Sequence, residues 1–397
     1  MSHQVLARKW RPKNFDSLVG QENTVQALVN ALDQERLHHA YLFTGTRGVG
    51  KTTLARILAK SLNCEKGISS NSCGECSSCL AVDKGNFVDL IEVDAASNTK
   101  VDEMRELLEN SQYAPTSGRF KVYIIDEVHM LSNSAFNAML KTLEEPPEHI
   151  KFILATTDPK KLPVTVLSRC LQFNLKQMTV EKISNHLDMI LGEEKIKFEK
   201  KALGLISKSA KGSMRDALSI LDQAIAYSGN EISEEKISEM LGVVDNNFLT
   251  EILFKLSENK GDELIEIGCG MNDKNIALDS TLDDLASLIH RVSVYQVAPS
   301  NELEYQNNNE IKKLSELFTP ETLQLLYQIV INGKKDIYLA PDLLTGFNTT
   351  LLRMLAFFPS MQSEKLEPKS KEKNMITSDE VISEKKNSKE RVIVDEK

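Results

Sequence analysis

The sequence of 397 residues has no long apolar run and few aromatic residues, with 6% aromatics and one tryptophan. No stretch approaches the ~20 apolar residues that span a bilayer, so we expect no membrane partner. The N-terminal segment has no apolar signal core, which predicts a chain that stays in a reducing cytoplasm without disulfides. No internal repeat of 20–50 residues is visible.

The sequence also lacks an overall positive charge. It carries 48 Lys and Arg against 57 Asp and Glu, a net charge of −9. Residues 1–178 carry +1 and residues 179–397 carry −10. Any binding of nucleic acid must therefore come from a local basic patch rather than from the net field.

Short apolar runs alternate with helical patterns between residues 40 and 175, which predicts an α/β domain with a parallel sheet covered on both faces. The expected strands are Ala40–Phe43, Val88–Val93, Lys121–Ile125 and Lys151–Ala155. The expected helices are Thr52–Leu62, Val101–Glu109 and Asn133–Leu143.

Strand signals disappear after Met178, and helical periodicity continues to Phe358. We expect a first domain at 1–178, a small helical domain at 179–242 and a second helical domain at 243–362. Residues 363–397 contain 18 charged residues and no aromatic one, so we expect a disordered tail. The helices expected after Met178 are Val180–Leu191, Lys201–Ser209, Ser213–Ala226, Glu234–Leu241, Phe248–Leu256, Leu282–Val294 and Glu321–Val330.

A glycine-rich loop with the pattern G-x-x-x-x-G-K-[ST] follows the first expected strand and precedes a helix. Its residues are Gly45, Thr46, Arg47, Gly48, Val49, Gly50, Lys51 and Thr52, with Thr53 next. The loop amides and Lys51 suit the phosphates of ATP, and the Thr52 hydroxyl suits Mg²⁺. The alternative is a glycine turn without a ligand.

Two acids, Asp126 and Glu127, follow a buried strand at the end where ligands bind in α/β sheets. We interpret Asp126 as a Mg²⁺ ligand and Glu127 as the group that polarises the attacking water, with the two on opposite strand faces. Simple strand caps are the alternative. His129 is interpreted as structural.

Four cysteines lie within 16 residues: Cys64, Cys73, Cys76 and Cys79. Four thiolates with C-x₂-C spacing suit tetrahedral Zn²⁺ in a closed structural site, and an iron–sulfur cluster uses the same donor set. No redox role is visible in the sequence, so zinc is favoured.

Two arginines stand near predicted site elements. Arg169 lies in Ser168-Arg-Cys170, and Arg215 begins a helix in the small domain. Either can stabilise the γ-phosphate of a nucleotide, one within its own chain and one in a neighbour. From spacing alone, a solvated surface role stays open for both.

Together these residues resemble the bacterial DNA polymerase III gamma/tau subunits, the AAA+ ATPases of the clamp loader. The resemblance covers at least residues 5–227 and is carried by several motifs: Leu6–Pro12, Val19–Gln21, the glycine-rich loop, the four cysteines, Asp126–Leu131, Phe136–Pro147, Ala155–Pro159, Ser168–Cys170 and Gly212–Asp216.

The resemblance implies further roles. Arg169 is similar to the family's trans-acting arginine finger and Arg215 to its sensor-2 residue, while Thr157, or alternatively Thr156, is similar to sensor 1. The family's adenine pocket corresponds to Ala7, Trp10, Arg11, Pro12 and Val19. The second helical domain resembles the oligomerising collar in type only, because it carries no matched motif.

The family's activity implies an ATPase that opens a sliding clamp and loads it on primed DNA, in a bacterial, nucleoid-associated assembly with delta and delta prime subunits and copies of itself. The chain resembles the shorter gamma form, since the tau form continues further. Delta prime lacks a working phosphate loop, and eukaryotic replication factor C lacks the four cysteines. A scaffold that binds nucleotide without turnover and another AAA+ motor remain the alternatives.

Contacts to DNA phosphates are expected from Lys100 and Arg105 on a predicted helix and from Thr165 in the Pro163–Thr165 loop. The alternative is that both cations pair with the neighbouring acids Asp102, Glu103 and Glu106.

Overall fold

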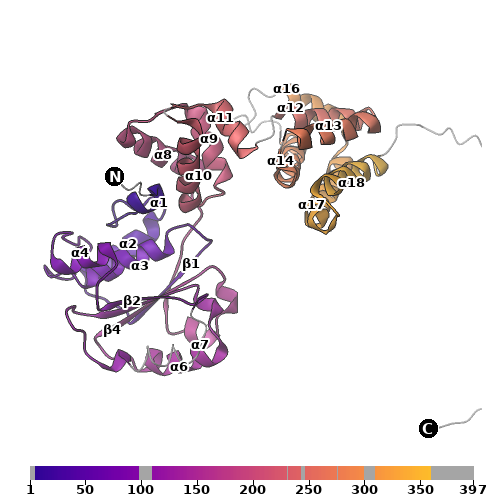
Figure 1. Cartoon of the computed structure of the whole chain (residues 1–397). Coiled ribbons are helices and arrows are strands. Elements are labelled where there is room, and N and C mark those ends of the chain that lie inside the picture. The colour runs from indigo at the N-terminus through magenta and orange to yellow at the C-terminus, as the bar shows by residue number, and fades with distance from the viewer. Residues whose placement is uncertain are drawn as a thin grey trace, which may run out of the picture.

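The computed structural model describes residues 5–97, 110–229, 231–242, 246–274, 276–298 and 309–358. Figure 1 shows an α/β body in indigo to magenta, a helical body directly above it, and a second helical body beside the first. Two predictions, the helix Val101–Glu109 and the tail 363–397, lie outside the described residues. Within the described ranges, no helix combines the length and apolarity that crossing a bilayer requires.

The α/β body is built on a parallel sheet with the strand order β2-β3-β4-β1-β5, which confirms the predicted fold class. The five strands are β1 (Ala40–Thr44), β2 (Leu90–Asp94), β3 (Lys121–Asp126), β4 (Ile150–Thr156) and β5 (Leu171–Asn174). The sequence analysis did not predict β5, which is a short, largely exposed edge strand.

Helices and short turns connect the strands of this body. They are α1 (Leu6–Lys9), α2 (Glu22–Asp33), α3 (Lys51–Leu62), α4 (Ser77–Lys84), η1 (Asn110–Gln112), η2 (Val128–Met130), α6 (Asn133–Glu144), η3 (Pro159–Lys161) and α7 (Val164–Leu167). One apolar cluster packs α3 on the sheet, and another packs α6 on it.

The register of the sheet places its polar strand ends on one edge. Thr44 pairs with Thr156, and Asp94 pairs with Asp126. Since parallel strands end at the same edge, the acids after β2 and β3 lie beside the glycine-rich loop that follows β1. This edge holds the candidate site.

The helical body above the sheet edge contains α8 (Val180–Glu194), α9 (Lys200–Ser209), α10 (Met214–Ser228) and α11 (Glu234–Leu241) around one apolar core. Side chains of Thr179 and Ser213 cap α8 and α10, accepting N–H groups of the first turn. The expected absence of strands after Met178 is wrong in detail, because β6 (Lys197–Phe198) and β7 (Glu231–Ile232) form a two-residue parallel pair.

The second helical body has a separate core. Its elements are α12 (Asn246–Ser257), α13 (Gly261–Asp273), α14 (Leu278–Val297), α16 (Asn309–Leu317), α17 (Pro320–Asp336), η4 (Ile337–Leu339) and α18 (Leu343–Ala356). Two ion pairs connect it to α9 and the following turn: Lys208 with Asp284 at 3.1 Å and Lys211 with Asp283 at 3.5 Å.

Candidate nucleotide site and cysteine centre

The glycine-rich loop turns between β1 and α3 with positive φ at Gly45, Gly48 and Gly50. A Cβ at Gly48 would lie 1.8 Å from the Ser213 hydroxyl oxygen, and one at Gly45 would lie 2.6 Å from the Leu175 carbonyl oxygen. Glycine is therefore favoured at both positions by the positive φ and by a close neighbour, which is the backbone after β5 at Gly45 and the start of α10 at Gly48.

Lys51 begins α3 and is 5% exposed. Its ammonium group donates to the carbonyls of Gly45 at 2.9 Å and Thr46 at 3.0 Å. Burial lowers the pKa of Lys51, while the charges of Glu127 and Asp126 act in the opposite direction. The loop thus holds a cation between its own backbone and two acids.

The Thr52 hydroxyl donates to Asp126 Oδ2 at 2.5 Å, which joins the start of α3 to the end of β3. The prediction that Asp126 and Glu127 occupy opposite faces of one strand is wrong, because Glu127 has φ 46° and ψ 43° and leaves the strand in a left-handed conformation. The backbone, rather than strand alternation, separates the two carboxylates.

The Glu127 carboxylate reaches the end of β4. Its Oε2 accepts from the Thr157 amide at 3.2 Å and the Thr157 hydroxyl at 2.9 Å. His129 Nδ1 lies 3.4 Å from the same oxygen. Sequence reasoning interpreted His129 only as structural and did not foresee this contact.

A cavity of about 990 Å³ opens at this sheet edge. The loop, both acids and three arginines from other elements surround it: Arg8 and Arg11 from the N-terminal segment and Arg215 from α10. Arg11 also donates to the Thr53 hydroxyl at 3.2 Å. The wall of the cavity also includes residues that the sequence analysis did not select, namely Val5, Arg8, Glu92, Val93, Asp94, Ala96 and Ile124.

A smaller apolar pocket of about 80 Å³ adjoins the loop. It contains the predicted adenine-pocket residues Ala7, Trp10, Arg11, Pro12 and Val19. Sequence reasoning missed Met178, which lies just before α8, and also His186 of α8 and Met214 and Leu218 of α10. The only available signal was the position of Met214 next to Arg215.

The structure does not bring Arg169 to the cavity of its own chain. Its guanidinium donates to the Thr165 carbonyl at 2.7 Å and to Glu144 Oε1 at 2.6 Å. The Thr165 side chain is exposed on α7. The other predicted DNA contacts, Lys100 and Arg105, lie outside the described residues.

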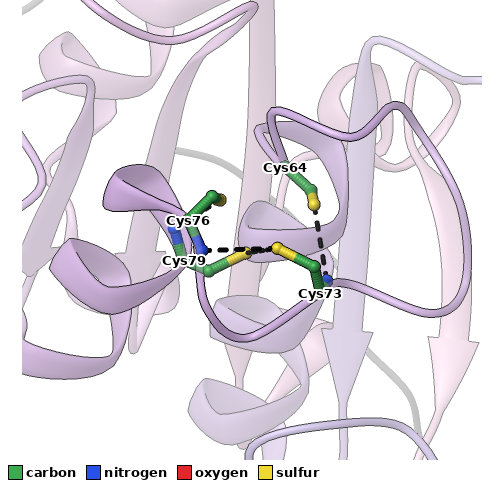
Figure 2. A group of neighbouring side chains, drawn as sticks. All are labelled: Cys64, Cys73, Cys76 and Cys79. Atoms are coloured by element: carbon green, nitrogen blue, oxygen red, sulfur yellow. Dashed lines mark hydrogen bonds between the residues drawn. The ribbon is translucent and has the colours of Figure 1, made fainter.

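The four cysteines converge between α3 and α4, and Figure 2 shows their sulfur atoms turned toward one another. All four Sγ atoms lie within 4.8 Å of one another. Backbone N–H bonds from Glu75 and Cys76 lower the pKa of Cys73 to about 6, whereas burial raises the pKa of Cys79. A soft four-sulfur set of this size suggests zinc.

The fold and the loop at the sheet edge together define the class of protein to which the chain belongs. A parallel sheet in this order, a phosphate-type loop before α3 and a helical body resting on that loop are the features of an AAA+ protein. Residues 182–230 match the family "DNA polymerase III clamp loader subunit, ATPase lid domain". Residues 20–179 match "DNA polymerase III, delta subunit", and residues 232–367 match "DNA polymerase III subunits gamma and tau domain III".

Relatives identify the family. The chain is 52% identical over 359 residues to the DNA polymerase III subunit tau/gamma of Haemophilus influenzae and 50% identical over 364 residues to subunit tau of Escherichia coli. Subunit gamma of Buchnera aphidicola subsp. Baizongia pistaciae is 46% identical, and the match covers 89% of this chain and 97% of that protein. The chain belongs to the gamma/tau subunit family of DNA polymerase III.

Coverage differs among these proteins. The match includes 90% of this chain but 52% of the Haemophilus protein, and 91% of this chain but 56% of the Escherichia protein, so the chain spans about half the length of these relatives. Among solved structures, the Thermotoga maritima RuvB Holliday junction branch migration motor is similar at 22% identity and a TM-score of 0.45. That match covers 62% of this chain and 79% of RuvB.

Proposed function

We propose that the chain binds and hydrolyses ATP with Mg²⁺ and uses the cycle to open a sliding clamp and load it on primed DNA. The observation that carries this proposal is the bond between Thr52 and Asp126, because it joins the phosphate loop to the acidic strand end beside Glu127. The proposed partners are delta and delta prime subunits and further copies of the chain, in a bacterial cytoplasm.

Each part of the site has a distinct task in this proposal. Lys51 and the loop amides bind the phosphates, and the apolar pocket receives the base. Thr52 and Asp126 would hold Mg²⁺, which supplies charge neutralisation when bound. Glu127 accepts a proton from the attacking water, Thr157 senses the γ-phosphate, and Arg215 contacts the phosphates from the helical body.

The proposal also assigns roles to the domains, the four cysteines, Arg169 and the DNA-contacting residues. Residues 1–178 form the ATPase domain, 179–242 the lid and 243–362 the collar that joins subunits. The four cysteines hold a structural Zn²⁺ with no open ligand position. Arg169 acts on the nucleotide of a neighbouring subunit, since its own chain holds it away from the cavity. Thr165 contacts DNA phosphate, as do Lys100 and Arg105.

The test is DNA-stimulated phosphate release by the full chain assembled with its partner subunits, clamp and primed DNA. We expect Lys51→Ala to abolish ATP binding and turnover, because the buried ammonium is the cation that the loop directs at the phosphates. Lys66→Ala is the control, since that lysine is exposed beside Glu75. Unchanged nucleotide affinity in Lys51→Ala contradicts the proposed phosphate site.

A further inference from the structure

One oxygen of Glu127 is anchored while the residue as a whole borders the nucleotide cavity. Oε2 receives two bonds from Thr157 and lies 3.4 Å from His129 Nδ1. Neither Thr157 nor His129 lines the cavity, whereas Glu127 does. Among the described residues, none donates a hydrogen bond to Oε1. The carboxylate is thus held through Oε2 on the side away from the cavity, and Oε1 is available to a water in the cavity.

His129 is itself held firmly. Its side chain is 10% exposed, and Nδ1 lies 3.0 Å from the Thr156 hydroxyl oxygen. Thr156 is fully buried, and its hydroxyl oxygen also accepts the Asp158 amide at 3.1 Å. Nδ1 therefore lies close to the oxygens of both Thr156 and Glu127. The ring orientation is fixed by the end of β4 rather than by solvent.

The backbone gives Glu127 little freedom to find this geometry by itself. It has a left-handed conformation, its N–H donates to Asp126 Oδ1 at 2.9 Å, and its carbonyl accepts the Met130 amide at 2.8 Å. Only rotation about side-chain bonds can move the carboxylate. The groups that contact Oε2, namely Thr157 and His129, therefore determine where Oε1 lies.

We propose that His129 is a positioning residue that orients the Glu127 carboxylate toward the attacking water, with Thr156 orienting His129 in turn. This inference rests on the proposed ATP hydrolysis. It assigns the imidazole no proton transfer and no contact with nucleotide. Glu127, His129 and the buried Thr156 then form a chain of contacts in which each group orients the next, as in other hydrolases whose catalytic base is held by a further residue.

The test compares three substitutions in the full chain under the same phosphate-release assay. His129→Ala removes the donor, His129→Asn keeps an amide N–H near the Nδ1 position, and His129→Gln moves it toward the Nε2 position. We expect kcat to fall about 5-fold in the Ala and Gln variants, because each loses the polar contact between Nδ1 and the Glu127 carboxylate. The KM for ATP and nucleotide affinity stay at wild-type values, and Asn restores most of kcat.

The readouts separate this inference from the proposed function. If the wild type turns over ATP and all three variants match it, or if Asn is as poor as Gln, positioning by His129 is refuted and ATP hydrolysis stands. A rise in KM with constant kcat also refutes it. Absence of turnover in the wild type refutes the proposed function. If the Ala variant does not fold, the Asn and Gln pair decides the question.

Discussion

Arg169 has a geometry suited to a partner outside its own chain. Its guanidinium pairs with Glu144 and the Thr165 carbonyl, and its side chain is 31% exposed. Such a surface pair contributes little to stability, so the arginine can exchange Glu144 for a phosphate at small cost. The side chain is therefore accessible on the surface, as the proposed contact with a neighbouring subunit's nucleotide requires.

We therefore expect Arg169→Ala to bind ATP with wild-type affinity and to lose turnover by about 1,000-fold or more, as for other arginine fingers. Phosphate release and nucleotide titration measure the two effects. Mixing this variant with Lys51→Ala chains should restore part of the activity, because the Arg169→Ala chains supply an intact nucleotide site and the Lys51→Ala chains supply the arginine. Lys161→Ala, another cation near an acid on this surface, is the control and keeps full activity. Loss of nucleotide binding in Arg169→Ala argues for a role within one chain.

At the scale of elements, the cysteine centre and α3 form one unit. Asn63 ends α3, Cys64 follows it, and the Asn63 side chain accepts the N–H groups of Arg119 and Phe120 before β3. The metal site is therefore tied to the helix that begins with Lys51 and to the strand that ends with Asp126.

We expect about one zinc per chain by elemental analysis and no effect of mild chelation on turnover until the cysteine segment unfolds, because a four-sulfur shell leaves no position for substrate. Cys73→Ser and Cys76→Ser should lower zinc content and thermal stability together. Cys269→Ser, an exposed cysteine of the second helical body, is the control. Iron in place of zinc, or metal-free protein of unchanged stability, contradicts this expectation.

Asp89 anchors the segment that enters β3. It is 1% exposed and accepts the amides of Thr116 at 2.7 Å, Ser117 at 2.7 Å and Gly118 at 2.6 Å. Burial alone would raise the pKa of Asp89, but these amides outweigh it and hold the pKa below 3.8. The anchor is therefore charged in the folded chain at neutral pH.

We expect Asp89→Asn to lower the free energy of unfolding by ~3 kcal/mol at pH 7, since bonds to a charged group are worth ~1.5–3 kcal/mol each and are only partly lost. Because the folded pKa is depressed, this stabilisation is present above 3.8 and is lost as pH falls through the folded value. Urea unfolding at several pH values measures the difference. Asp33→Asn, which removes an exposed carboxylate bonded to Ser70, should cost ~1 kcal/mol or less.

Much of this architecture could be predicted at the level of elements. The buried strands and the loop pattern give strong local signals, as at Ala40–Thr44, where every residue is buried. The edge strand Leu171–Asn174 was missed because exposure removes its apolar pattern. Met214 and His186 were missed because only the three-dimensional approach of α10 and α8 brings them to the small apolar pocket beside the loop. The left-handed Glu127 carries no sequence signal, since glutamate rarely adopts that conformation.

At the scale of the whole molecule, exposed ion pairs connect the two helical bodies. Asp283 contacts Lys211 of one body and Lys334 of the other, and Asp284 contacts Lys208. Each pair is partly exposed, so each is screened by salt and contributes little to unfolding energy. The pairs are better suited to setting an orientation than to holding the fold.

We expect the double variant Lys208→Glu and Lys211→Glu to change the free energy of unfolding by ~1 kcal/mol or less. It should broaden the distribution of distances between spin labels on α9 and α17, measured by pulsed electron paramagnetic resonance. High salt should have the same effect on the wild type. Lys201→Glu, whose partner Glu234 lies in the same body, is the control and leaves the distribution unchanged. A distribution that neither the double variant nor salt alters contradicts a role of these ion pairs in orienting the two helical bodies.

The proposed nucleotide pocket is divided between the α/β body and the first helical body, because the loop and acids come from the former and Arg215, Met214 and Leu218 from the latter. A chain in which these two bodies separate has no complete pocket, so any such opening would make the apparent dissociation constant equal to the intrinsic one divided by the fraction of chains with the pocket complete. Titration of a nucleotide would then report the arrangement of these two bodies as well as the contacts to the nucleotide. A substitution in the first helical body that does not touch the nucleotide can therefore change the affinity by altering how often the pocket is complete.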